Sequence, residues 1–160
     1  MLTARTKSPD DTRALAAELA AVSRRGDLVL LAGDLGAGKT TFVQGFGRAL
    51  NVEERITSPT FVIVHTYEGV FPVIHVDAYR LERLQELLDL GIGEYLDHEG
   101  VTLIEWGDAV VPALPPEFLE VRLELAEGDD ERIIRLRGSG ATWAARADAI
   151  AGALDRWVDR

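Results

Sequence analysis

Eight consecutive residues near the start of the chain, from Gly33 to Thr40, have the composition of a phosphate-binding loop. They fit the pattern G-x-x-x-x-G-K-[ST], the P-loop. In a glycine-rich turn that opens a helix, backbone N–H groups point at one spot and attract an anion. Side chains at Gly36 or Gly38 would crowd this bend. Lys39 would place a positive charge beside the terminal phosphates, and the Thr40 hydroxyl could ligate the accompanying magnesium ion.

The segments on either side of this loop are those that a P-loop needs. Residues 27–32 are an apolar run of strand length, and residues 41–50 read as a helix. The pattern thus lies between a strand and a helix, which is the context in which it binds nucleotides. The residues expected to hold the nucleotide phosphates are Asp34, Leu35, Gly36, Ala37, Gly38, Lys39, Thr40 and Thr41.

Two carboxylates at strand ends could complete a metal site beside the loop. Glu105 ends the apolar run of residues 101–105, and the carboxyl edge of a parallel sheet brings such an acid next to phosphate-bound magnesium. Asp77 ends residues 71–77 in the same way and could face the water shell of the metal. His75 shares a strand face with Asp77, so these two could form a hydrogen-bonded pair. The candidate catalytic residues are Lys39, Asp77 and Glu105, and the candidate magnesium ligands are Thr40 and Glu105.

Residues 57–60, Thr-Ser-Pro-Thr, follow the P-loop helix at a place where a switch segment could lie. A hydroxyl there can reach the terminal phosphate or the magnesium ion and become ordered when nucleotide binds. The same composition also suits an ordinary turn, because Ser and Pro are common in turns. The residues alone therefore leave both interpretations open.

The rest of the chain predicts an α/β fold around these residues. We expect a three-layer α/β/α P-loop NTPase fold with a mixed sheet and a C-terminal β-hairpin plus helix. Two pairs of apolar or alternating segments joined by short turns predict antiparallel hairpins. The predicted helices are residues 9–24, 41–50, 83–90 and 141–158, and the predicted strands are 27–32, 61–67, 71–77, 101–105, 119–125 and 132–137.

The length and composition predict a single globular domain over residues 1–160, with 47% hydrophobic and 28% charged residues. No apolar run is long enough to cross a membrane, and the polar residues 1–11 lack the apolar segment of a signal peptide. The chain has no cysteine, which excludes disulfides, thiolate metal sites and a cysteine nucleophile. We therefore expect a cytoplasmic protein with no membrane partner.

The net charge of −10 argues against a nucleic-acid-binding surface, which usually needs a basic footprint. The densest basic stretch, residues 132–137, alternates with Ile and Leu and follows four acidic residues within 127–131. We expect no DNA partner, and any role in nucleic-acid metabolism should run through a protein partner. Free nucleotide remains acceptable, because loop N–H groups, Lys39 and a metal would bind its phosphates.

Four motifs, taken in order and spacing, resemble one family. They are residues 33–42, residues 57–61, residues 75–81, and Gly91-Ile92 together with Ile104-Glu105-Trp106. This set is similar to the TsaE family (formerly YjeE), the small bacterial P-loop ATPases of tRNA threonylcarbamoyladenosine synthesis. The resemblance runs from about Thr12 to Glu124. Gly107 stands where the family often has proline, and the helix expected after Gly140 is not part of the resemblance.

The resemblance implies a protein that binds ATP and magnesium and hydrolyses ATP slowly until the TsaB–TsaD complex activates it. TsaD transfers the threonylcarbamoyl group to the adenosine next to the anticodon (t6A) in tRNAs that read codons beginning with adenine. TsaE supports the turnover of TsaD, so tRNA would be met only through these partners. The resemblance also implies that Lys39 holds phosphate and that Thr40 and Glu105 hold magnesium. Residues 57–60 would be the switch segment. Asp77 would lie near the metal or the attacking water, and Thr12 would approach the base.

Three other functions stay open at this point. A small-molecule P-loop kinase would need an acceptor pocket and usually an arginine-rich lid, whereas residues 81–100 are acidic with Arg83 as their one basic residue. A regulatory GTPase commonly uses an [NT]-K-x-D segment, which is absent because Lys7 and Lys39 are the only lysines. A non-catalytic binding module would retain its function without Lys39.

Overall fold

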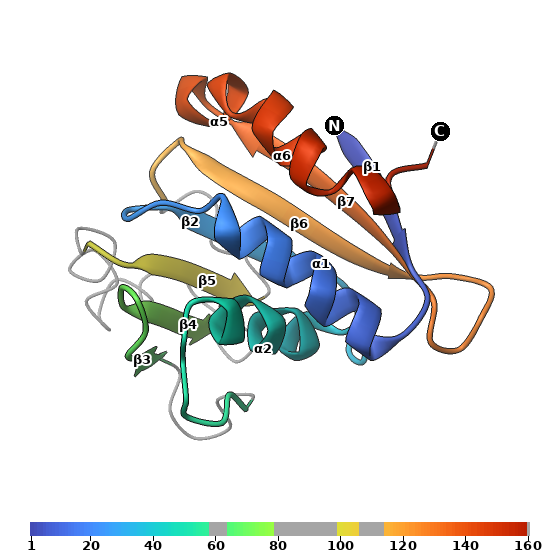
Figure 1. Cartoon of the computed structure of the whole chain (residues 1–160), viewed down its shortest axis with the longest axis horizontal. Helices are drawn as coiled ribbons and strands as arrows, with labels where there is room; N and C mark the ends of the chain where they lie inside the picture. The colour runs from blue at the N-terminus through green and yellow to red at the C-terminus, as the bar shows by residue number, and fades with distance from the viewer. Residues whose placement is uncertain (58–63, 79–98, 106–113, 160) are drawn as a thin grey trace.

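The structure is a computed structural model, and it describes residues 1–57, 64–78, 99–105 and 114–159. Within these ranges seven strands form one mixed sheet with the order β1-β7-β6-β2-β5-β4-β3 (Figure 1). Its strands are β1 (Leu2–Thr6), β2 (Leu28–Ala32), β3 (Val64–Tyr67), β4 (Val73–Asp77), β5 (Val101–Glu105), β6 (Phe118–Leu125) and β7 (Arg132–Ser139). Its helical segments are α1 (Pro9–Ala21), α2 (Lys39–Ala49), α5 (Ala141–Ala145), α6 (Ala147–Ala153) and the 3₁₀ turn η3 (Asp155–Trp157).

Strand β2 lies at the centre of the sheet and leads directly into the P-loop. It runs parallel to β5 on one side and to β6 on the other, and β4 runs parallel to β5. All five residues of β2 and of β5 are buried, as expected for parallel strands covered on both faces. Because parallel strands end at the same edge, the end of β2, Asp77 and Glu105 are brought together there.

The predicted α/β fold with a mixed sheet and a C-terminal hairpin is confirmed. Strands β6 and β7 pair antiparallel, and β3 pairs antiparallel with β4, as the two predicted hairpins require. One large apolar cluster joins α1 and α2 to Trp143, Ile150 and Leu154 of the C-terminal segment, so these helices share one face of the sheet (Figure 1). Leu30, Ile104 and other apolar residues form a second cluster on the opposite face. The helix predicted over residues 83–90 lies outside the described residues.

Helix α1 begins where its sequence signals a start. The Ser8 side chain accepts a hydrogen bond from the Asp11 N–H at 3.0 Å, which caps the helix, and Pro9 occupies the first turn. The helix ends at Ala21, three residues before the predicted end at Arg24. No helix in the described ranges is long and apolar enough to cross a membrane.

Two parts of the fold differ from the sequence-based expectations. The polar-looking start of the chain forms β1, which pairs antiparallel with β7 at the edge of the sheet. The expected terminal helix is divided into α5, α6 and η3, with a break at Arg146. The buried Arg146 guanidinium donates hydrogen bonds to both Asp27 carboxylate oxygens, at 2.7 and 2.9 Å, and to the Val22 carbonyl oxygen. This buried pair ties the break to the end of α1, a long-range contact that helical periodicity does not reveal.

Replacing Gly45 with alanine should lower the free energy of unfolding by about 1–3 kcal/mol, because the added methyl overpacks the crossing of α1 and α2. A Cβ atom at Gly45 would lie 2.5 Å from the Cα of Arg13 and would also collide with the Arg13 carbonyl oxygen. Both colliding atoms belong to the backbone of α1, so the two helices would have to separate. Urea denaturation followed by circular dichroism measures the change.

The matched control is Gly152→Ala in α6, where a Cβ would meet no atom within 4 Å. There alanine should be neutral or stabilising by up to about 1 kcal/mol, because glycine is the poorer helix former. Equal stability of the Gly45→Ala variant and the unmodified protein would show that α1 and α2 do not cross as closely as described.

Candidate nucleotide-binding site

The loop between β2 and α2 has the backbone shape of a P-loop. Gly33, Gly36 and Gly38 have φ angles of +144°, +82° and +105°, a region that side chains other than hydrogen disfavour. A Cβ atom at Gly33 would lie 2.5 Å from the Leu123 carbonyl oxygen, so the loop passes directly against β6. Helix α2 then starts at Lys39, and the first N–H groups of a helix have no carbonyl partner within it. The loop therefore presents N–H donors at the positive end of a helix dipole.

Lys39 lies inside the loop rather than in solvent and is only 5% exposed. Its ammonium group donates hydrogen bonds to the carbonyl oxygens of Gly33 at 2.7 Å and Asp34 at 3.0 Å. Burial lowers the pKa of Lys39 below 10.5, and the nearby carboxylates of Glu105, Asp77 and Asp34 offset part of that change. The ammonium group is thus held inside the loop by two carbonyl oxygens, which phosphate oxygens could replace.

Glu105 connects the end of β5 to the first turn of α2. It is 4% exposed, and its Oε1 accepts a hydrogen bond from the Thr40 hydroxyl at 3.2 Å. Its Oε2 lies 2.6 Å from Nε2 of the fully buried His75. The strand register sets Asp77 directly opposite Glu105 on the neighbouring strand β4. The structure therefore brings Lys39, Thr40, Asp77 and Glu105 to one edge of the sheet, as the sequence predicted.

The pairing of His75 with Asp77 that the sequence suggested is wrong. His75 uses Nε2 to contact Glu105, and its Nδ1 has no hydrogen-bond partner among the described residues. The reason is distance. Residues i and i+2 of one strand are separated by about 6.6 Å, whereas an adjacent strand lies about 4.8 Å away. The longer glutamate side chain of β5 therefore reaches the imidazole.

Thr40 and Glu105 fit a magnesium ion. Magnesium prefers oxygen ligands and is usually held by one or two protein groups together with phosphate oxygens and water. The Thr40 hydroxyl and the Glu105 carboxylate are oxygen donors 3.2 Å apart, at the end of the phosphate-binding loop. The contact of Glu105 with His75 orients the carboxylate from the other side.

Comparisons with known proteins show the family of the chain. The model of the family described as "Threonylcarbamoyl adenosine biosynthesis protein TsaE" matches residues 6–134, which include the loop, Asp77 and Glu105. The chain belongs to the TsaE family. A Bacillus subtilis (strain 168) protein named tRNA threonylcarbamoyladenosine biosynthesis protein TsaE is 44% identical over 137 residues, 85% of each chain.

Further relatives extend the match over nearly the whole chain. A Streptomyces coelicolor protein with the same TsaE name is 43% identical over 148 residues, covering 88% of this chain and 99% of that protein. A crystal structure of Bacillus subtilis YdiB superposes with a TM-score of 0.77 at 39% identity, covering 97% of this chain and 94% of that chain. The likeness to the YdiB structure therefore extends beyond the four motifs to the β6–β7 hairpin and the C-terminal segment.

The nucleotide contacts suggested by the loop pattern and by the resemblance to the TsaE family stay predictions. Thr12, which the resemblance suggested for the base, is 2% exposed, and its hydroxyl lies 2.7 Å from that of Thr6. Leu35 in the loop is 83% exposed. Residues 58–60 of the predicted switch segment lie outside the described residues.

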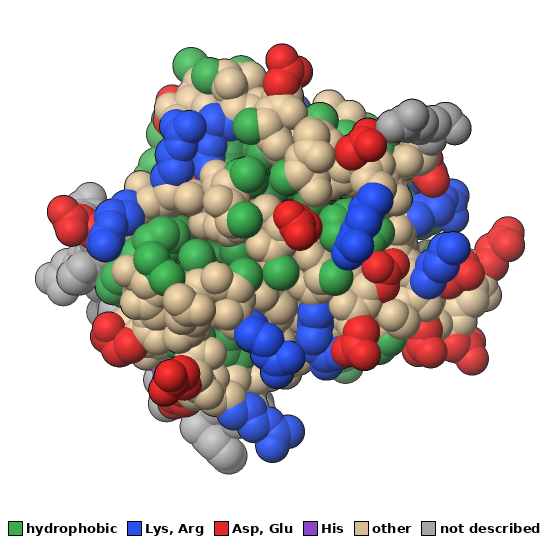
Figure 2. Space-filling view, viewed as in Figure 1, with side chains coloured by type: hydrophobic (Ala, Val, Ile, Leu, Met, Phe, Trp, Pro, Cys, Tyr) green, Lys and Arg blue, Asp and Glu red, His purple; other side chains and the backbone are tan. Residues whose placement is uncertain are grey.

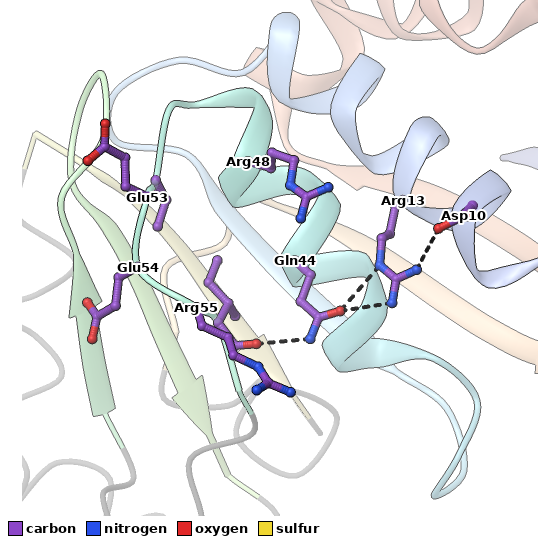
Figure 3. A pocket seen from close by; sticks show the side chains of 9 residues that line it. Asp10, Arg13, Gln44, Arg48, Glu53, Glu54 and Arg55 are labelled. Carbon is purple, nitrogen blue, oxygen red and sulfur yellow. Dashed lines mark hydrogen bonds and ion pairs between the residues drawn. The ribbon is translucent and has the colours of Figure 1, made fainter.

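A hollow of about 460 Å³ beside α2 contains polar residues that the sequence interpretation did not select (Figure 3). Gln44 lies one helical turn after Thr40 on the same face of α2. Its amide donates to the Ile56 carbonyl oxygen at 2.9 Å, and its carbonyl oxygen accepts from Arg13 at 3.2 and 3.3 Å (Figure 3). Gln44 thereby fixes the backbone just before the predicted switch segment to the helix that carries Thr40.

Proposed function

We propose that this chain is a magnesium-dependent ATPase that supports threonylcarbamoylation of the adenosine next to the tRNA anticodon. The observation that carries the proposal is the contact of Thr40 with Glu105 at the end of a P-loop that also holds Lys39. Membership of the TsaE family and the names of the relatives support the pathway. The lack of an [NT]-K-x-D segment supports ATP rather than GTP.

The chemistry follows from what each side chain can do. Lys39 exchanges the carbonyl oxygens of Gly33 and Asp34 for oxygens of the terminal phosphates, which stabilises charge there during hydrolysis. Thr40 and Glu105 would hold magnesium, which would neutralise phosphate charge. Asp77, which lies opposite Glu105 in the sheet, would lie near the metal or the attacking water. These steps depend on positioning and charge, as phosphoryl transfer generally does.

The proposed partners are TsaB and TsaD, with tRNA contacted only through them. The net charge of −10 supports this arrangement, because an RNA-binding surface is generally basic. On the face that carries α1 and α6, acidic and basic side chains are interspersed (Figure 2). Such a mixed surface suits a protein partner better than a phosphate backbone.

The test is ATP hydrolysis by the purified chain, measured as phosphate release, alone and with the TsaB–TsaD complex. We expect slow magnesium-dependent hydrolysis alone and stimulation of about tenfold or more by the complex, because a partner can complete an active site. GTP and chelated magnesium serve as controls. Equal hydrolysis with and without the complex would reject the proposed partnership, and a phosphorylated small molecule as product would indicate a kinase.

A further inference from the structure

Arg132 contacts the P-loop from outside, although it lies far from the loop in the sequence. It is the first residue of β7, just after the turn that joins β6 to β7. Its guanidinium donates to the Ala37 carbonyl oxygen from Nε at 2.9 Å and to the Gly36 carbonyl oxygen from Nη2 at 3.3 Å. Its Nη1 donates to the carbonyl oxygens of Asp129 and Glu131, both at 2.8 Å. One side chain thus joins the hairpin turn to the phosphate-binding loop.

The direction of these bonds matters for the amide groups of the loop. In a planar trans peptide the C=O and the following N–H point in opposite directions. The bond from Arg132 to the Ala37 oxygen therefore turns the N–H of Gly38 away from Arg132 and toward the inside of the loop. The preceding N–H, that of Ala37, already donates to the Asp34 carbonyl oxygen at 3.0 Å. Arg132 accordingly fixes the orientation of the peptide between Ala37 and Gly38, whose N–H can donate to a phosphate.

Electrostatics favour the same assignment. A carbonyl oxygen turned into the loop would repel phosphate, and Arg132 holds the oxygens of Gly36 and Ala37 on the outside. The guanidinium also adds positive potential behind the loop. The turn that anchors it is closed by its own backbone bond, from the Glu131 N–H to the Gly128 carbonyl oxygen at 3.1 Å. The hairpin turn therefore holds the Arg132 side chain in place against the loop.

We propose that Arg132 is a positioning residue that holds the P-loop in its phosphate-binding shape. The inference rests on the proposed function only in taking the ligand to be a nucleotide polyphosphate. Lysine cannot replace arginine here, because a single ammonium cannot direct parallel hydrogen bonds to the oxygens of Gly36 and Ala37 while also reaching the turn. The role is distinct from that of Lys39, which lies inside the loop.

The test compares Arg132→Gln and Arg132→Lys with Arg135→Gln. Arg135 lies three residues further along β7 and contacts the side chains of Glu124 and Thr3 instead of the loop. Calorimetric titration gives the Kd for ATP with magnesium and for inorganic triphosphate. Thermal unfolding without nucleotide gives the stability of each variant. Phosphate release gives KM and kcat.

We expect Arg132→Gln to raise the Kd for ATP and for triphosphate by about tenfold, and Arg132→Lys to recover little of the loss. Arg135→Gln should change both Kd values by less than about twofold, and the loss at Arg132 should appear in KM more than in kcat. A purely structural role for Arg132 would lower the unfolding temperature and leave the Kd values of the folded variant unchanged, which would overturn the proposal.

Three further outcomes are decisive. If Arg132→Gln does not fold, the Kd values of Arg132→Lys are compared with those of the unmodified chain instead: a rise supports the proposal, and no change overturns it. If the unmodified chain binds neither ATP nor triphosphate, the proposed function fails together with the role of Arg132. If it binds both and the Arg132 variants bind equally well, the positioning role alone is rejected.

Discussion

Replacing Glu105 with glutamine should reduce magnesium-dependent ATP hydrolysis by about two orders of magnitude or more, since it removes the charge of a proposed magnesium ligand. Glutamine has nearly the same size and shape as glutamate, so it can still reach Thr40 and His75. Only the negative charge is lost. The protein should stay folded and still bind nucleotide through its loop. Phosphate release at saturating ATP, titrated with magnesium, measures the loss and any rise in the magnesium requirement.

The control for Glu105 is Glu120→Gln on β6. Glu120 is part-buried on a strand next to β2 and pairs with Arg122 at 3.3 Å, without a described contact to the loop. It should retain hydrolysis within about twofold, as expected of a surface pair. Unchanged hydrolysis in Glu105→Gln would remove the metal-binding role assigned to Glu105. Replacing Glu105 with alanine, which removes the whole carboxyl group, should abolish hydrolysis.

Replacing Lys39 with methionine should weaken ATP binding by about 100-fold, because it removes the buried cation that we propose binds the terminal phosphates. Methionine keeps an unbranched stem in the space that Lys39 fills. Lys7→Met is the matched control, since Lys7 is the only other lysine of the chain. Calorimetric titration with ATP and with ADP should show the larger loss for ATP, because its third phosphate would bind the Lys39 ammonium group.

The lowered pKa of Lys39 makes ATP binding sensitive to alkaline pH. Burial is the main cause, and the charged form is the one that binds phosphate. As pH rises toward the lowered pKa, a growing fraction of Lys39 is neutral before binding, so ATP affinity should fall at a lower pH than an ordinary lysine would give. The affinity of Lys39→Met should lack this dependence. A wild-type Kd that stays constant from pH 7 through pH 10.5 would contradict the assignment.

The parts of the fold that follow from local sequence were predictable. Strands β2 and β5 are continuous apolar runs, and the loop glycines adopt the positive φ angles that a P-loop requires. Glu105 could be selected because it ends one of these runs. Strand β1 is not predictable in this way, because it is short and has polar or charged residues on both sides of the buried Ala4. Its place in the sheet depends on pairing with β7, near the other end of the chain.

The contacts that sequence could not provide are long-range ones. The bond of His75 to Glu105 depends on the register of β4 against β5, and Arg132 reaches the loop across 95 residues of sequence. The contact of the Thr12 hydroxyl with Thr6 is a further example, because it depends on the packing of α1 against the end of β1. Local patterns identify chemical groups, whereas pairing and packing decide which groups meet.

We propose that ATP hydrolysis by this chain supports repeated threonylcarbamoylation of tRNA. The most direct measurement mixes the chain with TsaB, TsaD, tRNA and threonylcarbamoyl-adenylate, and counts modified tRNA per TsaD over time. With ATP and magnesium we expect many modifications per TsaD, and Glu105→Gln should limit the reaction to about a single turnover. Multiple turnovers that proceed equally well without this chain, or without ATP, would contradict the account.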